Sequence, residues 1–178
     1  IPELTKRKIP LTIVGDVNSS SVAEHTIMFI LDLLKNTKKH DEMVRNGNWK
    51  DRDLLISNDF EGKRILIVGF GRIGQKVAKI ADAFGAKISV FDPYVIKKNH
   101  FPSNYQVIDK LETGLKQSDI VTLHAPGTTE PIIGEKEISL LNKDAIIINT
   151  SRGSHIDINA LCRAIEEKSI RAVGLDVY

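Results

Sequence analysis

The sequence has few of the residues that mark disulfide-bonded, membrane-spanning or nucleic-acid-binding proteins. Its single cysteine, Cys162, cannot form an intrachain disulfide, which favours a reducing cytoplasm. No apolar run reaches the ~20 residues of a membrane span, and no signal peptide is visible at the start. The 25 basic and 23 acidic residues leave a formal net charge of +2, which gives no footprint for nucleic acid. We therefore expect a cytoplasmic protein that binds neither membranes nor nucleic acids.

What the sequence does have is the composition of a globular domain. Of its 178 residues, 42% are hydrophobic and 27% are charged, which is enough to bury a core in one domain or slightly more. It begins at Ile1 without a methionine and ends abruptly in GLDVY. We expect both ends to be cut from a longer protein.

The stretch from residue 64 to residue 92 organises the rest of the chain. It reads RILIVGFGRIGQKVAKIADAFGAKISVFD. Residues 65–68 are typical of a buried parallel strand. Apolar residues at helical spacing follow a G-x-G-x-x-G turn formed by Gly69, Gly71 and Gly74. A second strand at 87–91 leads to Asp92, 18 residues after the last of these glycines. This order predicts a dinucleotide-binding unit.

Each part of this pattern has a physical role in holding a dinucleotide. The first glycine permits a tight turn, the second lets the backbone approach a pyrophosphate, and the third lets the helix pack closely on the strand. The pyrophosphate then lies at the free N–H groups of a helix N-terminus. Asp92 would accept hydrogen bonds from the adenosine ribose and repel a 2′-phosphate, which favours NAD over NADP. The alternative is a glycine turn that binds nothing, because the glycine pattern alone is weak.

The chain before this unit is expected to be mostly helical. The elements, in order, are a strand at 11–14, a polar turn at 15–20, a largely buried helix from 21 to about 36, a polar helix at 38–46 and a charged loop at 47–61. Ser21 and Glu24 fit a capping box at the start of the buried helix. His25, inside that helix, is interpreted as a partnered core or interface histidine, with a ligand role as the alternative.

Strands and helices alternate after Asp92. The expected elements are a basic surface loop at 97–100, a helix at 111–117, a strand at 119–123, a helical turn at 138–141, a strand at 144–149, a helix at 158–168 and a strand at 171–175. Cys162 is expected to face the core from the last of these helices. The alternation predicts a three-layer α/β/α domain around a doubly wound, mostly parallel sheet of the Rossmann type.

Ligands of such a sheet bind beyond the carboxyl ends of its strands. The residues expected there are the glycine turn at 69–74 with Arg72 and Ile73, then Asp92, Pro93, His124, Ala125, Pro126, Thr150, Ser151, Arg152 and Asp176. Because parallel strands end at the same edge, we expect these residues to surround one cofactor. No metal site is expected among them.

The chemistry of three of these residues suggests their functions. Asp176 is a suitable acceptor for the amide N–H of a nicotinamide. Arg152 is suited to bidentate capture of a substrate carboxylate, with an arginine paired to an acid at the sheet edge as the alternative. His124 is interpreted as a structural or backbone-contacting residue at the site, with a proton carrier as the alternative. Further on, Asp157 is expected to cap the helix that follows it.

Several short motifs together resemble one enzyme family. They are SVAEH at 21–25, VGFGRIG at 68–74, FDP at 91–93, LHAP at 123–126, NTSRG at 149–153 and GLDVY at 174–178. From about residue 11 to the end, the chain resembles the D-isomer-specific 2-hydroxyacid dehydrogenases, and within them the phosphoglycerate dehydrogenase branch. The resemblance implies an oxidoreductase that transfers a hydride between NAD and a D-2-hydroxy acid or 2-keto acid.

The resemblance implies a role for each residue at the strand ends. Arg72 and Ile73 would contact the pyrophosphate. Asp92 and Pro93 would contact the adenosine, and Ala125 and Pro126 its adenine side, with His124 beside them. Thr150 and Asp176 would hold the nicotinamide, next to Ser151, and Arg152 would hold the substrate carboxylate.

The resemblance also implies parts that follow the end of this sequence. In the family, a histidine paired with a glutamate takes the hydroxyl proton, and both would lie beyond Tyr178. We therefore expect residues 1–20 to be a remnant of the substrate domain, residues 21–178 to be the NAD-binding domain, and this chain alone to be inactive. His124 and His155 do not match the catalytic motif. Ser154 and His155 follow Gly153 where the family usually has a second glycine.

The resemblance finally implies a homodimer, formed through the helix that begins near Ser21, whose broad apolar surface fits a partner. One alternative is a non-catalytic NAD-sensing module of the corepressor kind. Another is an unrelated Rossmann protein such as a methyltransferase, which would leave Arg152 and Asp176 without a purpose.

Overall fold

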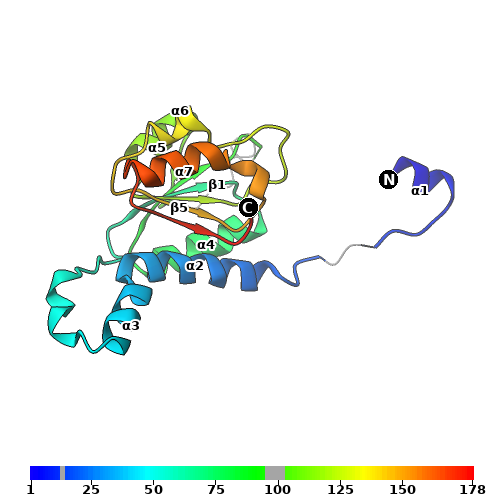
Figure 1. Ribbon diagram of the computed structural model, residues 1–178. Coiled ribbons are helices and arrows are strands. Elements are labelled where there is room, and N and C mark those ends of the chain that lie inside the picture. The colour runs from blue at the N-terminus through cyan, green and yellow to red at the C-terminus, as the bar shows by residue number, and fades with distance from the viewer. Residues whose placement is uncertain (13–14, 95–102) are drawn as a thin grey trace.

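A parallel sheet forms the centre of the computed structural model, which describes residues 1–12, 15–94 and 103–178 (Figure 1). The sheet has six strands in the order β3-β2-β1-β4-β5-β6, and every pair is parallel. This is the order of the doubly wound dinucleotide-binding fold, in which the chain changes direction across the sheet between β1 and β4. The predicted fold class is confirmed.

The strands are short and mostly apolar. They are β1 (Arg64–Val68), β2 (Lys87–Phe91), β3 (Gln106–Val107), β4 (Ile120–Leu123), β5 (Ile146–Asn149) and β6 (Ala172–Leu175). The whole of β4 and β5, and all of β1 after Arg64, is buried, as expected for strands covered on both faces. The sequence did not predict β3, because two exposed residues carry no hydrophobic pattern.

Helices cover both faces of the sheet, giving the three predicted layers (Figure 1). One face is covered by α2 (Ser19–Lys35) and α4 (Arg72–Ala83), the other by α5 (Leu111–Gln117), α6 (Glu135–Ile138) and α7 (Ile158–Glu166). Alternate side chains of β1 divide the core. Ile65 and Ile67 join the cluster under α2 and α4, while Leu66 and Val68 join the cluster on the opposite face.

The predicted capping box at Ser21 is wrong, because α2 begins two residues earlier. Its N-cap is Asn18, whose carbonyl accepts the N–H of Val22 at 3.0 Å, so Ser21 and Glu24 both lie inside the helix. Three consecutive serines follow Asn18, and only burial distinguishes them: Ser19 is buried against the body of the protein. The predicted end is confirmed, since Asn36 adopts φ +52° and stops the helix.

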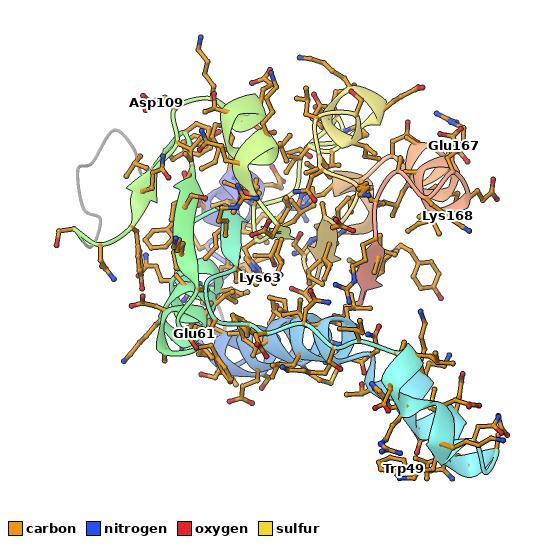
Figure 2. All side chains as sticks on the ribbon, turned by 90° about the vertical axis from the view of Figure 1, so that its left-hand side faces the viewer. Trp49, Glu61, Lys63, Asp109, Glu167 and Lys168 are labelled. Atoms are coloured by element: carbon orange, nitrogen blue, oxygen red, sulfur yellow. The ribbon has the colours of Figure 1, made fainter. Side chains whose placement is uncertain are left out.

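A helical arm, made of α3 (Thr37–Arg45) and the 3₁₀ helix η1 (Trp49–Leu54), extends from the end of α2. The sequence predicts α3 to within a residue but assigns η1 to a charged loop. None of the residues in either helix is buried, so the sequence has no hydrophobic face from which η1 could be predicted. Figure 2 shows Trp49 at the outer part of this arm, away from the sheet.

Two further predictions on the second half of the chain are corrected. The helical turn expected at 138–141 is α6, which starts earlier because the Glu137 carboxylate accepts the N–H of Gly134 at 3.1 Å. Cys162 is exposed rather than turned to the core. The buried face of α7 consists of Ala160, Leu161 and Ala164, and residue 162 lies outside that face.

The start of the chain contributes little to the packed body. The helix α1 (Pro2–Lys6) has no buried residue and lies apart from the sheet (Figure 1). The strand expected at 11–14 is absent at residues 11–12, while residues 13–14 lie outside the described residues, as does the basic loop expected at 97–100. Within the described ranges, no helix combines the length and apolar character required to cross a membrane.

Candidate cofactor and substrate site

The first glycine of the G-x-G-x-x-G motif directly follows β1 and packs against the backbone just beyond β4. Gly69 has φ +95°, and a Cβ added to it would lie 2.6 Å from the backbone nitrogen of Ala125. Its N–H donates to the carbonyl of Phe91 at 2.9 Å, and the N–H of His124 donates to Val68 at 2.7 Å. The turn therefore closes the gap between the two strands at the switch point of the sheet.

The other two glycines have different surroundings. A Cβ on Gly74 would collide with the carbonyl oxygen of Gly69 and lie 3.3 Å from Ile67, so this glycine lets α4 pack on β1. A Cβ on Gly71 would meet nothing within 4 Å. Gly71 is the N-cap of α4, and its carbonyl accepts the first helical bond from Gln75 at 3.0 Å. Open space therefore lies in front of a helix N-terminus, as an anion requires.

Asp92 is fixed next to this turn. It is 8% exposed, and its two carboxylate oxygens accept the N–H groups of Phe70 and Tyr94, each at 2.8 Å. The side chain thus ties the end of β2 to the glycine turn. It also lines a cavity of about 300 Å³, whose other walls include Gly69, Pro93, Ala125, Pro126, Thr128 and Ile132. The cavity is mostly apolar with a carboxylate at one wall, which suits an adenosine.

His124, at the end of β4, is a neutral group. Its Nε2 is 2.9 Å from the hydroxyl of Thr122, and within the described part of the chain its buried Nδ1 has no hydrogen-bond partner. Burial lowers the pKa of the imidazole to about 4, so the ring carries no charge at neutral pH. An uncharged ring with an unsatisfied nitrogen beside the glycine turn is suited to a neutral ligand group rather than to proton transfer.

Thr150, just beyond β5, is oriented by a residue that the sequence did not indicate. Its hydroxyl lies 2.9 Å from the hydroxyl of Thr26 on α2, and both residues are buried. Thr26 donates its own proton to the carbonyl of Val22 at 2.8 Å. Thr26 must therefore accept from Thr150, which leaves the lone pairs of the Thr150 oxygen directed elsewhere as acceptors. The one available signal was a threonine on the buried face of an apolar helix.

The loop after β5 holds Arg152 in an exposed position. The Asn149 side chain shapes this loop: its Nδ2 donates to the carbonyl of Arg152 at 2.8 Å, and its Oδ1 accepts the N–H of Ser151 at 3.1 Å. The guanidinium donates to the carbonyl of Ser151 at 2.7 Å. Among the described residues, no carboxylate forms an ion pair with Arg152, so the alternative of a structural Arg–acid pair is not observed.

Asp176 follows β6 at the same edge. Its N–H donates to the carbonyl of Asn149 at 3.0 Å, and its Oδ1 lies 3.5 Å from Nε2 of His25. His25 also packs edge-on against Phe29, with ring centroids 4.5 Å apart. His25 therefore has a partner, as predicted, and that partner belongs to the candidate site, but the 39% exposed side chain of His25 is not part of the core.

The structure brings the predicted residues together at one edge of the sheet, and it adds residues that the sequence did not suggest. Thr26 bonds Thr150, His25 reaches Asp176, and His155 lies beneath the Arg152 loop. Asp157 caps α7 as predicted, accepting the N–H groups of Asn159 and Ala160. In the ranges 1–12, 15–94 and 103–178, no group of three or more His, Cys, Asp or Glu side chains is placed to hold a metal ion.

The strand order and the glycine turn at its switch point define a dinucleotide-binding domain. A family model described as "D-isomer specific 2-hydroxyacid dehydrogenase, NAD binding domain" matches residues 27–178. The chain belongs to this family, and the resemblance seen in its motifs is confirmed. NAD is accordingly its cofactor.

Individual relatives agree with this assignment. The chain is 38% identical over 176 residues to D-3-phosphoglycerate dehydrogenase of Methanocaldococcus jannaschii, covering 98% of this chain and 33% of the relative. It is also 38% identical over 186 residues to glyoxylate reductase of Thermococcus litoralis, covering 100% of this chain and 56% of the relative.

A solved structure, D-lactate dehydrogenase of Aquifex aeolicus complexed with NAD and lactic acid, is similar with a TM-score of 0.86 and 32% identity. It is matched over 99% of this chain and 53% of its own. The chain thus spans between a third and about half of the length of these relatives.

Proposed function

We propose that this chain is the cofactor domain of an oxidoreductase that transfers a hydride between NAD and a D-2-hydroxy acid or 2-keto acid. The observation that carries the proposal is the exposed guanidinium of Arg152. It has no carboxylate partner among the described residues and lies at the sheet edge that also bears the glycine turn and Asp92. A cation in that place is suited to a substrate carboxylate.

Different residues at this edge of the sheet would contact different parts of the cofactor. We assign the pyrophosphate to the N-terminus of α4 with Arg72 and Ile73, and the adenosine to Asp92, Pro93, His124, Ala125 and Pro126. The nicotinamide half would lie against Thr150, Ser151 and Asp176. Two features support this assignment: the open space before Gly71 and the acceptor lone pairs of Thr150. Asp92, at the ribose, favours NAD over NADP.

This chain's own chemistry is binding and orientation. When bound, the nicotinamide supplies the group that accepts or donates the hydride. Arg152 would hold the carboxylate by two parallel N–H bonds, fix the neighbouring carbon over the ring and polarise its oxygen. The ring of His124 is neutral, so His124 is not assigned the proton transfer. We assign that step to a glutamate–histidine pair outside this sequence.

The domain assignment has the same basis. Residues 21–178 would form the NAD-binding domain, and residues 1–20 would belong to a substrate domain and its hinge. The relatives named above act on phosphoglycerate, glyoxylate and lactate by name, so the substrate class is proposed and the particular acid is left open. Their names are those of enzymes, and they do not favour a regulatory NAD-sensing module.

We further propose a homodimer formed through α2 and a cytoplasmic location. An apolar groove of about 410 Å³ supports the first, because Ile27, Met28 and Leu31 of α2 line it together with Ile80 of α4. The single cysteine in the sequence supports the second.

The proposal is tested by titrating the chain with NADH and NADPH and following the nicotinamide fluorescence. We expect NADH to bind and NADPH to bind at least about tenfold more weakly, since Asp92 repels the 2′-phosphate. Oxalate, a mimic of a 2-keto acid, should then perturb the bound NADH signal. Arg152→Met should abolish the oxalate response while leaving NADH affinity within about twofold.

Asp144→Asn serves as the control, because Asp144 lies at the opposite edge of the sheet, before β5. It should change neither titration. Without the glutamate–histidine pair, the chain should reduce glyoxylate or pyruvate at a negligible rate. Tight NADPH binding, an unaltered oxalate response in Arg152→Met, or sustained NADH oxidation would each contradict the proposal.

A further inference from the structure

A completely buried histidine lies directly beneath the candidate substrate loop. His155 ends the 3₁₀ helix η3 (Gly153–His155) and has 0% of its surface exposed. A polar ring in such a place loses stability unless both of its nitrogens are hydrogen-bonded. Both are, and their partners come from two different parts of the candidate site.

The first partner fixes the tautomer of the ring. Nε2 of His155 lies 3.0 Å from the carbonyl oxygen of Pro126, and a carbonyl can only accept. Nε2 therefore carries the proton. Burial lowers the pKa of His155, and the charge of Arg152 lowers it further, while the bond to Pro126 acts in the opposite direction. The ring is thus neutral at pH 7, with a bare Nδ1.

The second partner follows from that tautomer. Nδ1 of His155 lies 2.8 Å from the hydroxyl of Ser151, so Ser151 must donate to it. The same hydroxyl donates to Oδ1 of Asn149 at 2.8 Å, so its one proton is shared between two acceptors, this Oδ1 and Nδ1 of His155. Oδ1 of Asn149 also accepts the backbone N–H of Ser151 at 3.1 Å. Ser151 is consequently held in place by His155 together with Asn149, and it adjoins both Thr150 and Arg152.

The backbone of His155 adds to the connection that its Nε2 makes with the loop of Pro126. Its carbonyl accepts the N–H groups of Ile132 and Ile133 at 2.9 and 3.0 Å. Ile132 and Pro126 both line the cavity that contains Asp92. One residue therefore holds two points on the wall of the adenine-side cavity and one point on the loop that carries Arg152.

We propose that His155 is a positioning residue that couples the wall of the adenine-side cavity, formed by the loop 126–133, to the loop 150–152. Filling the cavity would thereby fix the position of Arg152. The inference rests on the proposed function for which ligand each loop contacts: the adenosine at the cavity and the nicotinamide with the substrate at the loop 150–152. We call the hydrogen bonds of His155 to Pro126, Ile132, Ile133 and Ser151 the bridge, and the bridge itself does not depend on that assignment.

Three substitutions separate the two sides of the bridge. His155→Leu fills the space but removes both side-chain bonds. His155→Gln offers an amide N–H near the Nε2 position and retains the bond to Pro126. Ser151→Ala keeps the Pro126 bond and breaks the link to the Arg152 loop. His40→Leu, on the distant helix α3, is the matched control.

The probe is ADP, which carries the adenosine and pyrophosphate of NAD and lacks the nicotinamide half. We expect His155→Leu to weaken ADP binding by about tenfold and His155→Gln to restore it to within about threefold of the unsubstituted chain. In ¹⁵N spectra of the unsubstituted chain, ADP should shift the amide signals of Ser151 and Arg152. Both shifts should be lost in His155→Leu, and the shift of Arg152 should also be lost in Ser151→Ala at a saturating concentration of ADP.

The outcomes distinguish failure of the bridge from failure of the proposed function. The bridge is overturned if His155→Leu, folded by its thermal transition, binds ADP normally or still transmits the shift to Arg152. It is also overturned if the ring ¹⁵N signals of the ligand-free chain at pH 7 show a protonated Nδ1 or a charged ring. Absence of NADH and ADP binding to the unsubstituted chain would refute the proposed function, and the ring signals would still decide on the bridge. If His155→Leu does not fold, Ser151→Ala and His155→Gln carry the same test.

Discussion

At the scale of single residues, two glycines of the turn serve different purposes, one the packing of the fold and the other the binding of a ligand. Gly74 lies where any side chain would strike the carbonyl of Gly69, whereas the space in front of Gly71 is open. Both belong to the same motif, and both are needed for a dinucleotide in the proposed assignment. The structure gives each a different reason for being glycine: contact between α4 and β1 for Gly74, and room for a ligand for Gly71.

We therefore predict opposite results for two matched alanine variants. Gly74→Ala should lower the free energy of unfolding by about 1–3 kcal/mol, because the added methyl group overpacks the junction of α4 with β1. Gly71→Ala should change that free energy by less than about 1 kcal/mol but weaken NADH binding by about tenfold or more. Urea denaturation and NADH titration of the two proteins check this. An unstable Gly71→Ala, or a stable Gly74→Ala, would reverse the assignment.

The sequence could predict the positions of those residues that directly follow a strand. The glycine turn, Asp92, Arg152 and Asp176 each follow directly from the end of a strand, so finding the strands was enough to find them. His155 and Thr26 were different, because their hydrogen bonds join segments far apart in the sequence. His155 meets Pro126, and Thr26 meets Thr150; only the three-dimensional packing brings these groups together.

At the scale of elements, one ion pair fixes the beginning of β1 against the beginning of β4. The Asp119 carboxylate accepts the backbone N–H of Arg64 at 2.9 Å and two guanidinium bonds at 3.1 and 2.6 Å. Burial alone would raise the pKa of Asp119, but the bonds from Arg64 outweigh it and lower the pKa below its ordinary value of 3.8. The pair lies at the opposite edge of the sheet from the candidate site.

This pair should make stability depend on pH in the acid range. Because the folded pKa of Asp119 is depressed, its stabilising effect is present above pH 3.8 and is lost as the pH falls below that value. Asp119→Asn should cost about 1–2 kcal/mol at pH 7, a figure discounted because half of the Arg64 side chain is exposed. The difference between the two proteins should shrink at about pH 3 in urea denaturation. Asp41→Asn, in the exposed pair with Arg45 on α3, should show neither effect.

Elements were predictable in type and less so in their limits. The central strands and α4 appear as expected, because long apolar runs are typical of buried strands and the spacing of apolar residues after Gly74 is typical of a helix. The start of α2 was not predictable, because Asn18 and the three serines after it are all acceptable N-caps, and only the packing of the helix selects among them. The 3₁₀ helix η1 and strand β3 also escaped prediction, since neither has a buried face to impose a period.

At the scale of the whole molecule, the edge of the sheet where the strands begin and the edge where they end have different functions. One edge bears the ion pair of Arg64 with Asp119, which joins strand beginnings and serves stability. The other edge bears the glycine turn, Asp92 and the Arg152 loop. Because all described strands are parallel, every strand end contributes to the second edge, and residues from 69 to 176 meet there. On the face covered by α2 and α4, apolar side chains of both helices line a groove of about 410 Å³.

The proposed homodimer is tested at this groove. Met28 of α2 is 48% exposed and lines the apolar groove shared with Ile80 of α4. We expect the chain to have twice its mass of 19.8 kDa in sedimentation equilibrium, and Met28→Lys to reduce it to that of a single chain, because dimer formation would remove a lysine charge from water within a mostly apolar groove. Ile165→Lys is the matched control: Ile165 is 38% exposed on α7, which covers the opposite face of the sheet, and its substitution should leave the dimer intact. A monomeric unsubstituted chain, or equal effects of the two lysines, would show that α2 is not the dimer surface.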